Sequence, residues 1–446
     1  MDRELMQDLV KWKNSPRRKP LILQGARQVG KTWLMKEFGR RFYKHTAYVN
    51  LDNNPRMQKV FEQDFDIDRI LLSINAETHV EITPETLIIL DEVQESPMAI
   101  SSLKYFCENA PQYSVITAGS LLGIALHKGI SYPVGKVNTL QLHPLSFYEF
   151  LNATGDEGLA NLLEQGDWPT ISAFHDRFEF ALKNYYFVGG MPECVEIFTE
   201  TKDYGMVRSS QNDLLSLYEA DFGKHIPTKD FALARLIWHA IPGQLAKENK
   251  KFQYSVVKKG GRASQYLGCI QWLEDAGIAQ RCYNTTITEL PLDGNAITDC
   301  FKLYTTDIGL LMAMLDYGTQ ADILKGNLLG YKGAIFENLM ADFLCKSGQR
   351  LYYFHKESGL ELDFLVRFKG ECVVIEVKSK TGKAKSMNTI LKNKAIYHVN
   401  NAIKLGQYNV GRDGDVLTVP LYMGFLIQDK LTDVIIPDVD LTAAIV

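Results

Sequence analysis

The stretch LILQGARQVGKTWLM, residues 21–35, decides the fold of the N-terminal part of this chain. It contains the pattern G-x-x-x-x-G-K-[ST], in which Gly25 and Gly30 bracket four residues and Lys31 and Thr32 follow at once. Such a loop binds phosphate only when it lies between a buried strand and the N-terminus of a helix. Both flanks meet this condition, because an apolar run precedes the loop and apolar residues at helical spacing follow it. The sequence therefore predicts a strand, a phosphate-binding loop and a helix.

Each residue type in this loop has a physical role. The glycines allow backbone N–H groups to turn toward phosphate oxygens, Lys31 reaches the β and γ phosphates, and the Thr32 hydroxyl can bind Mg²⁺. ATP and Mg²⁺ are therefore the expected cofactors. The predicted nucleotide-binding residues are Gly25, Ala26, Arg27, Gln28, Val29, Gly30, Lys31, Thr32 and, from a later strand, Asp91.

That later strand is TLIILDEVQES, residues 86–96. Its apolar run predicts a buried strand that ends in Asp91 and Glu92, and open α/β sheets bind ligands at this carboxyl end. Asp91 is expected to hold Mg²⁺ together with Thr32, and Glu92 is expected to polarise the attacking water. The pair therefore predicts hydrolysis of the nucleotide and not binding alone.

Two further strands end in polar residues. YSVITAGS, residues 113–120, ends in Thr117 and Ser120, and Ser120 is predicted to contact the γ-phosphate or the water, with a helix N-cap as the equal alternative. TAYVNLDNNP, residues 46–55, ends in Asn50 and Asp52, which either contact the site or only form a strand-end turn.

Composition limits the classes of function. At about 150 residues per domain, 446 residues predict about three domains. A net charge of -4 speaks against a globally basic nucleic-acid binder, although a local basic face is compatible with it. The seven cysteines are scattered without C-x-x-C spacing, which is typical of reduced thiols in the cytoplasm and not of disulfides or a zinc site. No apolar run reaches about 18 residues, so we expect no membrane span.

The middle of the chain predicts helix, turn, helix and a hairpin-like strand pair, which is the layout of a winged helix-turn-helix. The recognition helix is expected to begin near Ala263. A basic cluster precedes it, and it either contacts DNA phosphates or is a solvated face of a lid or interaction domain. The cluster contains Lys247, Lys250, Lys251, Lys258, Lys259 and Arg262, with Glu248 as its one acid.

The last third predicts a helix with Glu337 and three strands that carry Asp363, Glu376 and Lys378. The E-x-K spacing places Glu376 and Lys378 on the same face of one strand. This part resembles the PD-(D/E)XK nuclease core, and the resemblance implies that Glu337, Asp363 and Glu376 hold Mg²⁺ or Mn²⁺ while Lys378 acts on the water. Glu361 is either a further ligand or a residue exposed by strand alternation.

Motifs along nearly the whole chain resemble the bacterial and archaeal AAA+ type P-loop ATPases that carry a C-terminal domain of unknown function. Gly135 and Lys136 stand where such proteins usually show Gly-Arg, and because a lysine lacks the bidentate fork, the resemblance carries no arginine-dependent sensing role to this position. The motifs are GARQVGKT, LIILDEVQ, TAGS, HPLSFYEF (His143–Phe150), FVGGMPECV (Phe187–Val195), LYEADFGK (Leu217–Lys224) and FKLYTTDIGLL (Phe301–Leu311).

The expected chain is α/β: a P-loop NTPase parallel sheet in residues 1–160, a helical winged-helix domain in 161–330 and a restriction-endonuclease-like α/β domain in 331–446. One hypothesis is a cytoplasmic ATPase whose nucleotide state controls a DNA-associated nuclease-like module. The alternative is an ATP-dependent regulatory switch in which an inactive nuclease fold binds protein or DNA. The retained acids and lysine favour the first hypothesis, and the lack of overall basic charge and of an obvious arginine finger favours the second. The oligomeric state stays open.

Overall fold

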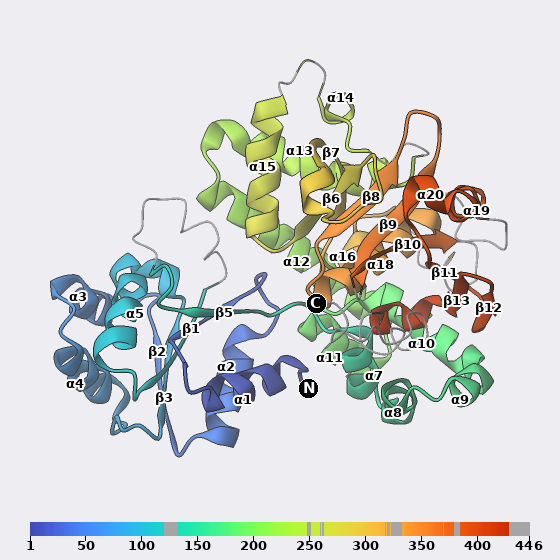
Figure 1. Ribbon diagram of the computed structural model, residues 1–446. Helices are drawn as coiled ribbons and strands as arrows, with labels where there is room; N and C mark the ends of the chain where they lie inside the picture. Colours follow the sequence, from blue (N-terminus) through green and yellow to red (C-terminus); the bar gives the residue numbers. More distant parts are fainter. Residues whose placement is uncertain are drawn as a thin grey trace, which may run out of the picture. The chain divides into compact units, whose positions relative to one another are not determined.

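The computed structural model divides the chain into two compact units, each of which is described by itself (Figure 1). Unit 1 contains Met1–Leu145 and Gln271–Ile278, and unit 2 contains Ser146–Ile270 and Ala279–Val446. The structure describes residues 1–119, 133–247, 251–258, 260, 263–316, 318, 322, 332–368, 370–378 and 384–427.

The described part of unit 1 contains a five-stranded parallel sheet in the order β2-β3-β4-β1-β5. Its interior strands are continuous apolar runs because parallel strands are covered on both faces. Strand β1 pairs with both β4 and β5, so the strand order reverses there, and ligands bind at such a switch point. This confirms the predicted parallel sheet. The strands are β1 (Leu21–Gln24), β2 (His45–Asn50), β3 (Thr86–Asp91), β4 (Ser114–Ala118) and β5 (Asn138–Gln141).

Helices cover both faces of this sheet. The side chains of Ile88 and Leu90 form one core with α3, α4 and α5, while α2 packs on β2, β3 and β4 from the other side. The helix α3 begins with Pro55 and is capped by Asn54, whose side chain accepts a hydrogen bond from Met57 N. The helices are α1 (Leu5–Asn14), α2 (Lys31–Phe42), α3 (Pro55–Gln63), α4 (Ile67–Thr78), α5 (Pro97–Asn109) and the short η1 (Val93–Glu95).

Unit 2 begins with a series of helices. The first, α7, has a capping box in which Ser146 and Glu149 satisfy each other's backbone N–H groups. Within the described residues, no helix of the chain combines the length and the apolar character that crossing a bilayer requires. The helices before the sheet are α7 (Phe147–Thr154), α8 (Glu157–Gln165), α9 (Trp168–Ala173), α10 (His175–Val188), α11 (Pro192–Thr201), α12 (Tyr204–His225), α13 (Thr228–Leu245) and α14 (Tyr254–Val257). The helix α15 (Ala263–Asp275) begins in unit 2, and its residues from Gln271 onward belong to unit 1.

The described part of unit 2 also holds an eight-stranded mixed sheet in the order β12-β13-β11-β10-β9-β8-β6-β7 (Figure 1). One of its faces packs on α19, and α18 packs on β7, β8 and β10. The strands are β6 (Ala279–Thr285), β7 (Ala296–Thr305), β8 (Leu351–His355), β9 (Glu361–Phe368), β10 (Glu371–Lys378), β11 (Ala402–Gly406), β12 (Gly411–Asp413) and β13 (Val416–Pro420). The accompanying helices are η3 (Asp293–Asn295), α16 (Ile308–Ala313), α18 (Lys332–Lys346), α19 (Lys385–Lys392), α20 (Lys394–Tyr397) and η4 (Leu421–Leu426).

The helix predicted near Ala263 is α15, and the predicted strand pair is the antiparallel hairpin of β6 and β7. Strand β6 also pairs in parallel with β8, so the hairpin belongs to the same sheet as the three strands of the last third. A winged helix and a nuclease core, and the three-domain division with a boundary at residues 330 and 331, stay predictions. The sheet runs across that predicted boundary.

Two of the sequence motifs meet where α10 ends and α16 begins. The Asp307 carboxylate accepts hydrogen bonds from Gly190 N at 2.7 Å and from Leu310 N at 2.8 Å. The backbones lie so close that a methyl group at Gly309 would be 2.6 Å from both Gly189 N and Val188 O. This close approach requires glycine.

We therefore expect Gly309→Ala to lower the free energy of unfolding by roughly 1–3 kcal/mol, because the two helices must separate to admit the methyl group. The matched control is Gly268→Ala in α15, where an added methyl group meets no atom within 4 Å. The control should be neutral or stabilising by up to about 1 kcal/mol, since alanine favours a helix interior. Denaturant titration of both variants measures the two changes, and equal values would contradict the packing argument.

Candidate functional site

The loop between β1 and α2 has the backbone shape of a phosphate cradle. Gly25 (φ 151°), Gln28 (φ 65°) and Gly30 (φ 93°) all have positive φ. At Gly25 a Cβ atom would lie 2.3 Å from the carbonyl oxygen of Leu142, so only glycine fits there. The left-handed residues turn the loop back on itself before α2 begins at Lys31.

Lys31 is 8% exposed and lies inside this loop. Its Nζ donates to the carbonyl oxygens of Gly25 at 2.9 Å and of Ala26 at 2.7 Å. Burial lowers the pKa of Lys31 to about 8, while the carboxylates of Glu92 and Asp91 oppose this shift. Because the Lys31 ammonium group is buried, it has little hydration to lose when a phosphate group binds.

The predicted magnesium residues Thr32 and Asp91 are in direct contact. Thr32 Oγ1 donates to Asp91 Oδ2 at 2.6 Å, and the hydroxyl of Tyr48 donates to the same oxygen at 3.1 Å. The other carboxylate oxygen, Oδ1, accepts from Glu92 N at 3.0 Å. Hydroxyl and carboxylate oxygens are the donors that Mg²⁺ prefers, so this pair fits the ion that the loop implies. Tyr48 was not predicted.

Glu92 follows the end of β3 in a left-handed conformation, with φ 50° and ψ 43°. This conformation costs a non-glycine residue about 1–2 kcal/mol, and such costs are concentrated at functional sites. The side chain of Gln94 donates to Glu92 Oε2 at 2.6 Å and fixes the carboxylate. The role of Glu92 in orienting water stays a prediction, and Gln94 is a neighbour of its carboxylate that the sequence did not indicate.

The polar residues at the ends of β4 and β2 were the other predicted candidates for this site. Thr117 is buried and its hydroxyl donates to Leu21 O at 3.4 Å, which ties β4 to β1. Ser120 lies outside the described residues. Asn50 accepts from Asp52 N at 2.9 Å, which is the turn that was one of the two interpretations. Lys136 forms an ion pair with Glu108 at 2.8 Å.

Arg3 is a site residue that the sequence motifs did not indicate. It is 6% exposed, and its guanidinium donates to Val29 O at 2.9 Å and to His143 O at 2.6 Å. The first acceptor belongs to the phosphate loop and the second follows β5. Arg3 therefore links the phosphate loop to the segment after β5, and a single arginine before an amphipathic helix gave no signal of this.

The second candidate site gathers the predicted residues of the last third. Lys378 contacts Glu376, as the E-x-K spacing predicts, and Asp363 Oδ2 accepts from Val377 N at 2.7 Å. Burial and the Asp363 carboxylate raise the pKa of Glu376 to about 7, against the opposing effect of Lys378. Glu337 on α18 accepts a hydrogen bond from the Tyr304 hydroxyl at 3.2 Å.

Lys302 joins these acids, and the sequence motifs did not identify it. Its Nζ is 2.9 Å from Glu361 Oε1 and 3.6 Å from Glu337 Oε2. Burial alone would lower the pKa of Lys302, but Glu361 and Asp363 raise it above its ordinary value. Within the described ranges, no group of three or more His, Cys, Asp and Glu side chains has the arrangement of a metal site. A charged residue in the apolar strand CFKLY was the signal that could have drawn attention to it.

Comparison with known proteins finds family matches for three parts of the chain, the first of which contains the loop between β1 and α2. Residues 17–151 match the family model of an AAA domain. They form an AAA-type P-loop ATPase domain. Residues 179–321 match a domain of unknown function (DUF8612), and residues 332–422 match another (DUF4143). A comparison with curated proteins found no match.

Three solved structures illustrate the similarity of other proteins to this chain. A Walker-type ATPase of Pyrococcus abyssi is 12% identical, with 70% of this chain and 95% of that chain covered and a TM-score of 0.43. PCH-2 of C. elegans is 15% identical (37% and 47% covered, TM-score 0.23). The ORC1 protein of Aeropyrum pernix, solved in complex with DNA, is 14% identical (72% and 92% covered, TM-score 0.27). Because every TM-score is below 0.5, these similarities carry no information on what this chain binds.

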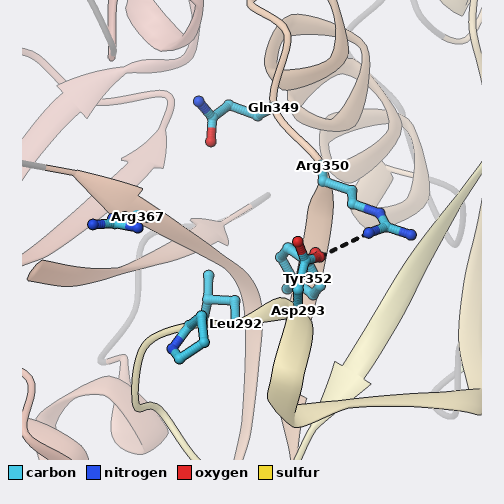
Figure 2. Close-up of a pocket in the computed structure, with 7 residues that line it drawn as sticks. Leu292, Asp293, Gln349, Arg350, Tyr352 and Arg367 are labelled. Carbon is cyan, nitrogen blue, oxygen red and sulfur yellow. Dashed lines mark hydrogen bonds and ion pairs between the residues drawn. The ribbon is translucent and has the colours of Figure 1, made fainter. Parts of the chain in front are cut away.

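A small pocket of about 150 Å³ lies between the turn at η3 and strands β8 and β9 (Figure 2). Arg350 Nη1 is 2.8 Å from Asp293 Oδ1, and Tyr352 contacts the same carboxylate. Figure 2 shows Arg367 apart from this pair. The pocket is lined by Pro291, Leu292, Asp293, Gln349, Arg350, Tyr352 and Arg367, and thus by no residue predicted to bind ATP or metal.

We expect Arg3→Ala to weaken ATP binding by the AAA domain, because the loop carbonyl of Val29 loses a charged donor that costs about 1–3 kcal/mol to remove. Arg17→Ala is the control, since Arg17 is an exposed arginine of the same N-terminal region. Calorimetric titration with ATP measures both affinities. If Arg3→Ala binds ATP as tightly as Arg17→Ala does, Arg3 does not position the loop.

Proposed function

We propose that the chain binds and hydrolyses ATP and that its nucleotide state controls the C-terminal module. The observation that supports hydrolysis best is the contact of Thr32 with Asp91 beside the buried Lys31, with Glu92 held at the adjoining strand end. A binding site alone would have no need for a second carboxylate in a strained conformation.

The residues divide the work between binding and chemistry. The backbone of the loop and Lys31 Nζ bind the β and γ phosphates, and the low pKa of Lys31 rises as the phosphate charge replaces the carbonyl contacts. Thr32 and Asp91 would hold Mg²⁺, which supplies positive charge to the phosphate oxygens when it is bound. Glu92 accepts a hydrogen bond from the attacking water and aligns it with the γ phosphate, and Gln94 keeps the carboxylate in place.

For the C-terminal module, the two hypotheses require different properties of the cluster formed by Glu337, Glu361, Asp363 and Glu376, which we call the carboxylate centre. A nuclease-like module that cleaves DNA needs a divalent ion at Glu337, Asp363 and Glu376, whereas a regulatory switch needs only a folded binding surface. The ammonium group of Lys302 beside Glu337 and Glu361 favours the switch. We therefore propose an ATP-dependent switch as the leading function, with a metal-dependent nuclease as the second candidate.

DNA is the proposed partner of the segment before α15. Lys247, Lys251 and Lys258 are exposed there, while Lys250, Lys259 and Arg262 of the predicted cluster lie outside the described residues. Exposed lysines next to a helix N-terminus suit phosphate contacts that do not depend on base sequence. A protein partner at the same surface is the alternative.

Lys31→Ala should abolish detectable ATP binding, while Glu92→Gln should keep it and lose about 10²–10⁴-fold in turnover. The reason is that Lys31 neutralises the triphosphate charge, whereas Glu92 acts on the water alone. Calorimetry and phosphate release measure the two effects, with Lys11→Ala, an exposed lysine of α1, as the control. Normal ATP affinity in Lys31→Ala would refute the proposed site.

Changing Lys247, Lys251 and Lys258 together to Glu should weaken DNA binding equally for all sequences and flatten the plot of log affinity against log salt. Each lost phosphate contact reduces that slope by about 0.9. A control with the same change in net charge replaces the exposed Lys59, Lys104 and Lys385 by Glu. If both triple variants show the same slope, the segment before α15 does not contact DNA.

A further inference from the structure

The carboxylate centre of unit 2 already contains buried positive charge. Lys302 lies on β7 and is 0% exposed. Its Nζ also lies 4.7 Å from the centre of the Tyr353 ring, so an aromatic face covers it. The acids of the centre are Glu337, Glu361, Asp363 and Glu376, and three of them, Glu337, Asp363 and Glu376, are buried.

Acids at this density need a cation. Like charges in a weakly polar environment repel, and an unpaired buried carboxylate is costly. In a metal-dependent site a divalent ion supplies the compensating charge. Here Lys302 Nζ lies between Glu361 on β9, at 2.9 Å, and Glu337 on α18, at 3.6 Å.

Several other oxygens of the centre have partners, whereas Glu376 Oε2 is buried and has no hydrogen-bond partner among the described residues. Asp363 Oδ2 accepts from Val377 N, Glu337 Oε2 accepts from Tyr304, and Glu376 contacts Lys378. A divalent ion shared by the three predicted ligands would lie near the Lys302 ammonium, which is 3.6 Å from Glu337 Oε2. Electrostatic repulsion between the two cations opposes this.

We propose that Lys302 is the built-in cation of the carboxylate centre and takes the place of the divalent metal, so that a metal binds there only when Lys302 is replaced. This inference goes beyond the ATPase proposal and is independent of it, because the residues belong to unit 2 and the P-loop belongs to unit 1. The centre then ties β7, β9, β10 and α18 together by charge and is closed to metal-dependent phosphodiester cleavage.

The test measures Mn²⁺ binding to the full chain without nucleotide, by electron paramagnetic resonance. The variants are Lys302→Met, the charge-preserving control Lys302→Arg, and Asp363→Asn in both the wild-type and the Lys302→Met background. Any Mn²⁺ bound at the P-loop is common to all of them, so the change caused by Asp363→Asn reports the carboxylate centre alone.

Asp363→Asn should leave Mn²⁺ binding of the wild type unchanged, and Lys302→Arg should bind Mn²⁺ as the wild type does. Lys302→Met should gain a site with at least about tenfold tighter affinity, because a repelling charge next to the ligands is gone. Asp363→Asn should remove the gained site. A folded Lys302→Met variant that gains no Mn²⁺ site would overturn the proposal.

Lys302→Met also leaves buried acids without their counter-ion, so its stability is measured in parallel. A thermal unfolding midpoint that rises with Mn²⁺ in this variant and not in the wild type supports the proposal. Should the variant fail to fold even with Mn²⁺, the wild-type pair decides: Mn²⁺ binding that Asp363→Asn abolishes refutes the proposal, and unchanged binding supports it. ATP affinity in Lys302→Met, expected to equal that of the wild type, separates this result from a failure of the ATPase site.

Discussion

The hydrogen bond from Thr32 to Asp91 is the contact on which the nucleotide site depends. It joins two residues that are 59 positions apart in the chain, one in the first turn of α2 and one at the end of β3. Strand β4 separates β1 from β3 in the sheet, and the two motifs meet because α2 packs on β2, β3 and β4. The arrangement of the sheet, the turn at Gly25 and the clamp by Arg3 all serve to keep this one distance short.

The two buried lysines show how the same side chain acquires different properties from its partners. Lys31 contacts backbone carbonyl groups, and burial lowers its pKa to about 8. Lys302 contacts carboxylates, which raise its pKa. The first ammonium gains from any anion that enters, whereas the second is already compensated. The second lysine therefore already has the anionic partners that the first would gain from a bound phosphate.

Short sequence patterns predicted the structural features that depend on residues close together in the chain. The glycine spacing identified the P-loop, the apolar runs identified the parallel sheet, and the acids at the end of β3 identified Asp91 with Glu92. Each of these patterns consists of residues a few positions apart in the chain. The E-x-K spacing predicted the proximity of Glu376 and Lys378 for the same reason. Arg3, Tyr48 and Lys302 could not be found in this way, since each acts on residues from distant parts of the chain. Only the tertiary fold brings Lys302 beside Glu337 and Glu361.

The pairing of β6 with β8 has a consequence for how the chain is made. Residues 279–305 form a hairpin early, but β6 has its second neighbour only when residues 351–355 have left the ribosome. Until then the hairpin carries an open strand edge, the kind of surface that other chains can join. During this interval the acids of α18, β9 and β10 have not yet been synthesised, so Lys302 on β7 lacks them. Synthesis of the last third thus supplies both the second neighbour of β6 and the acids that contact Lys302.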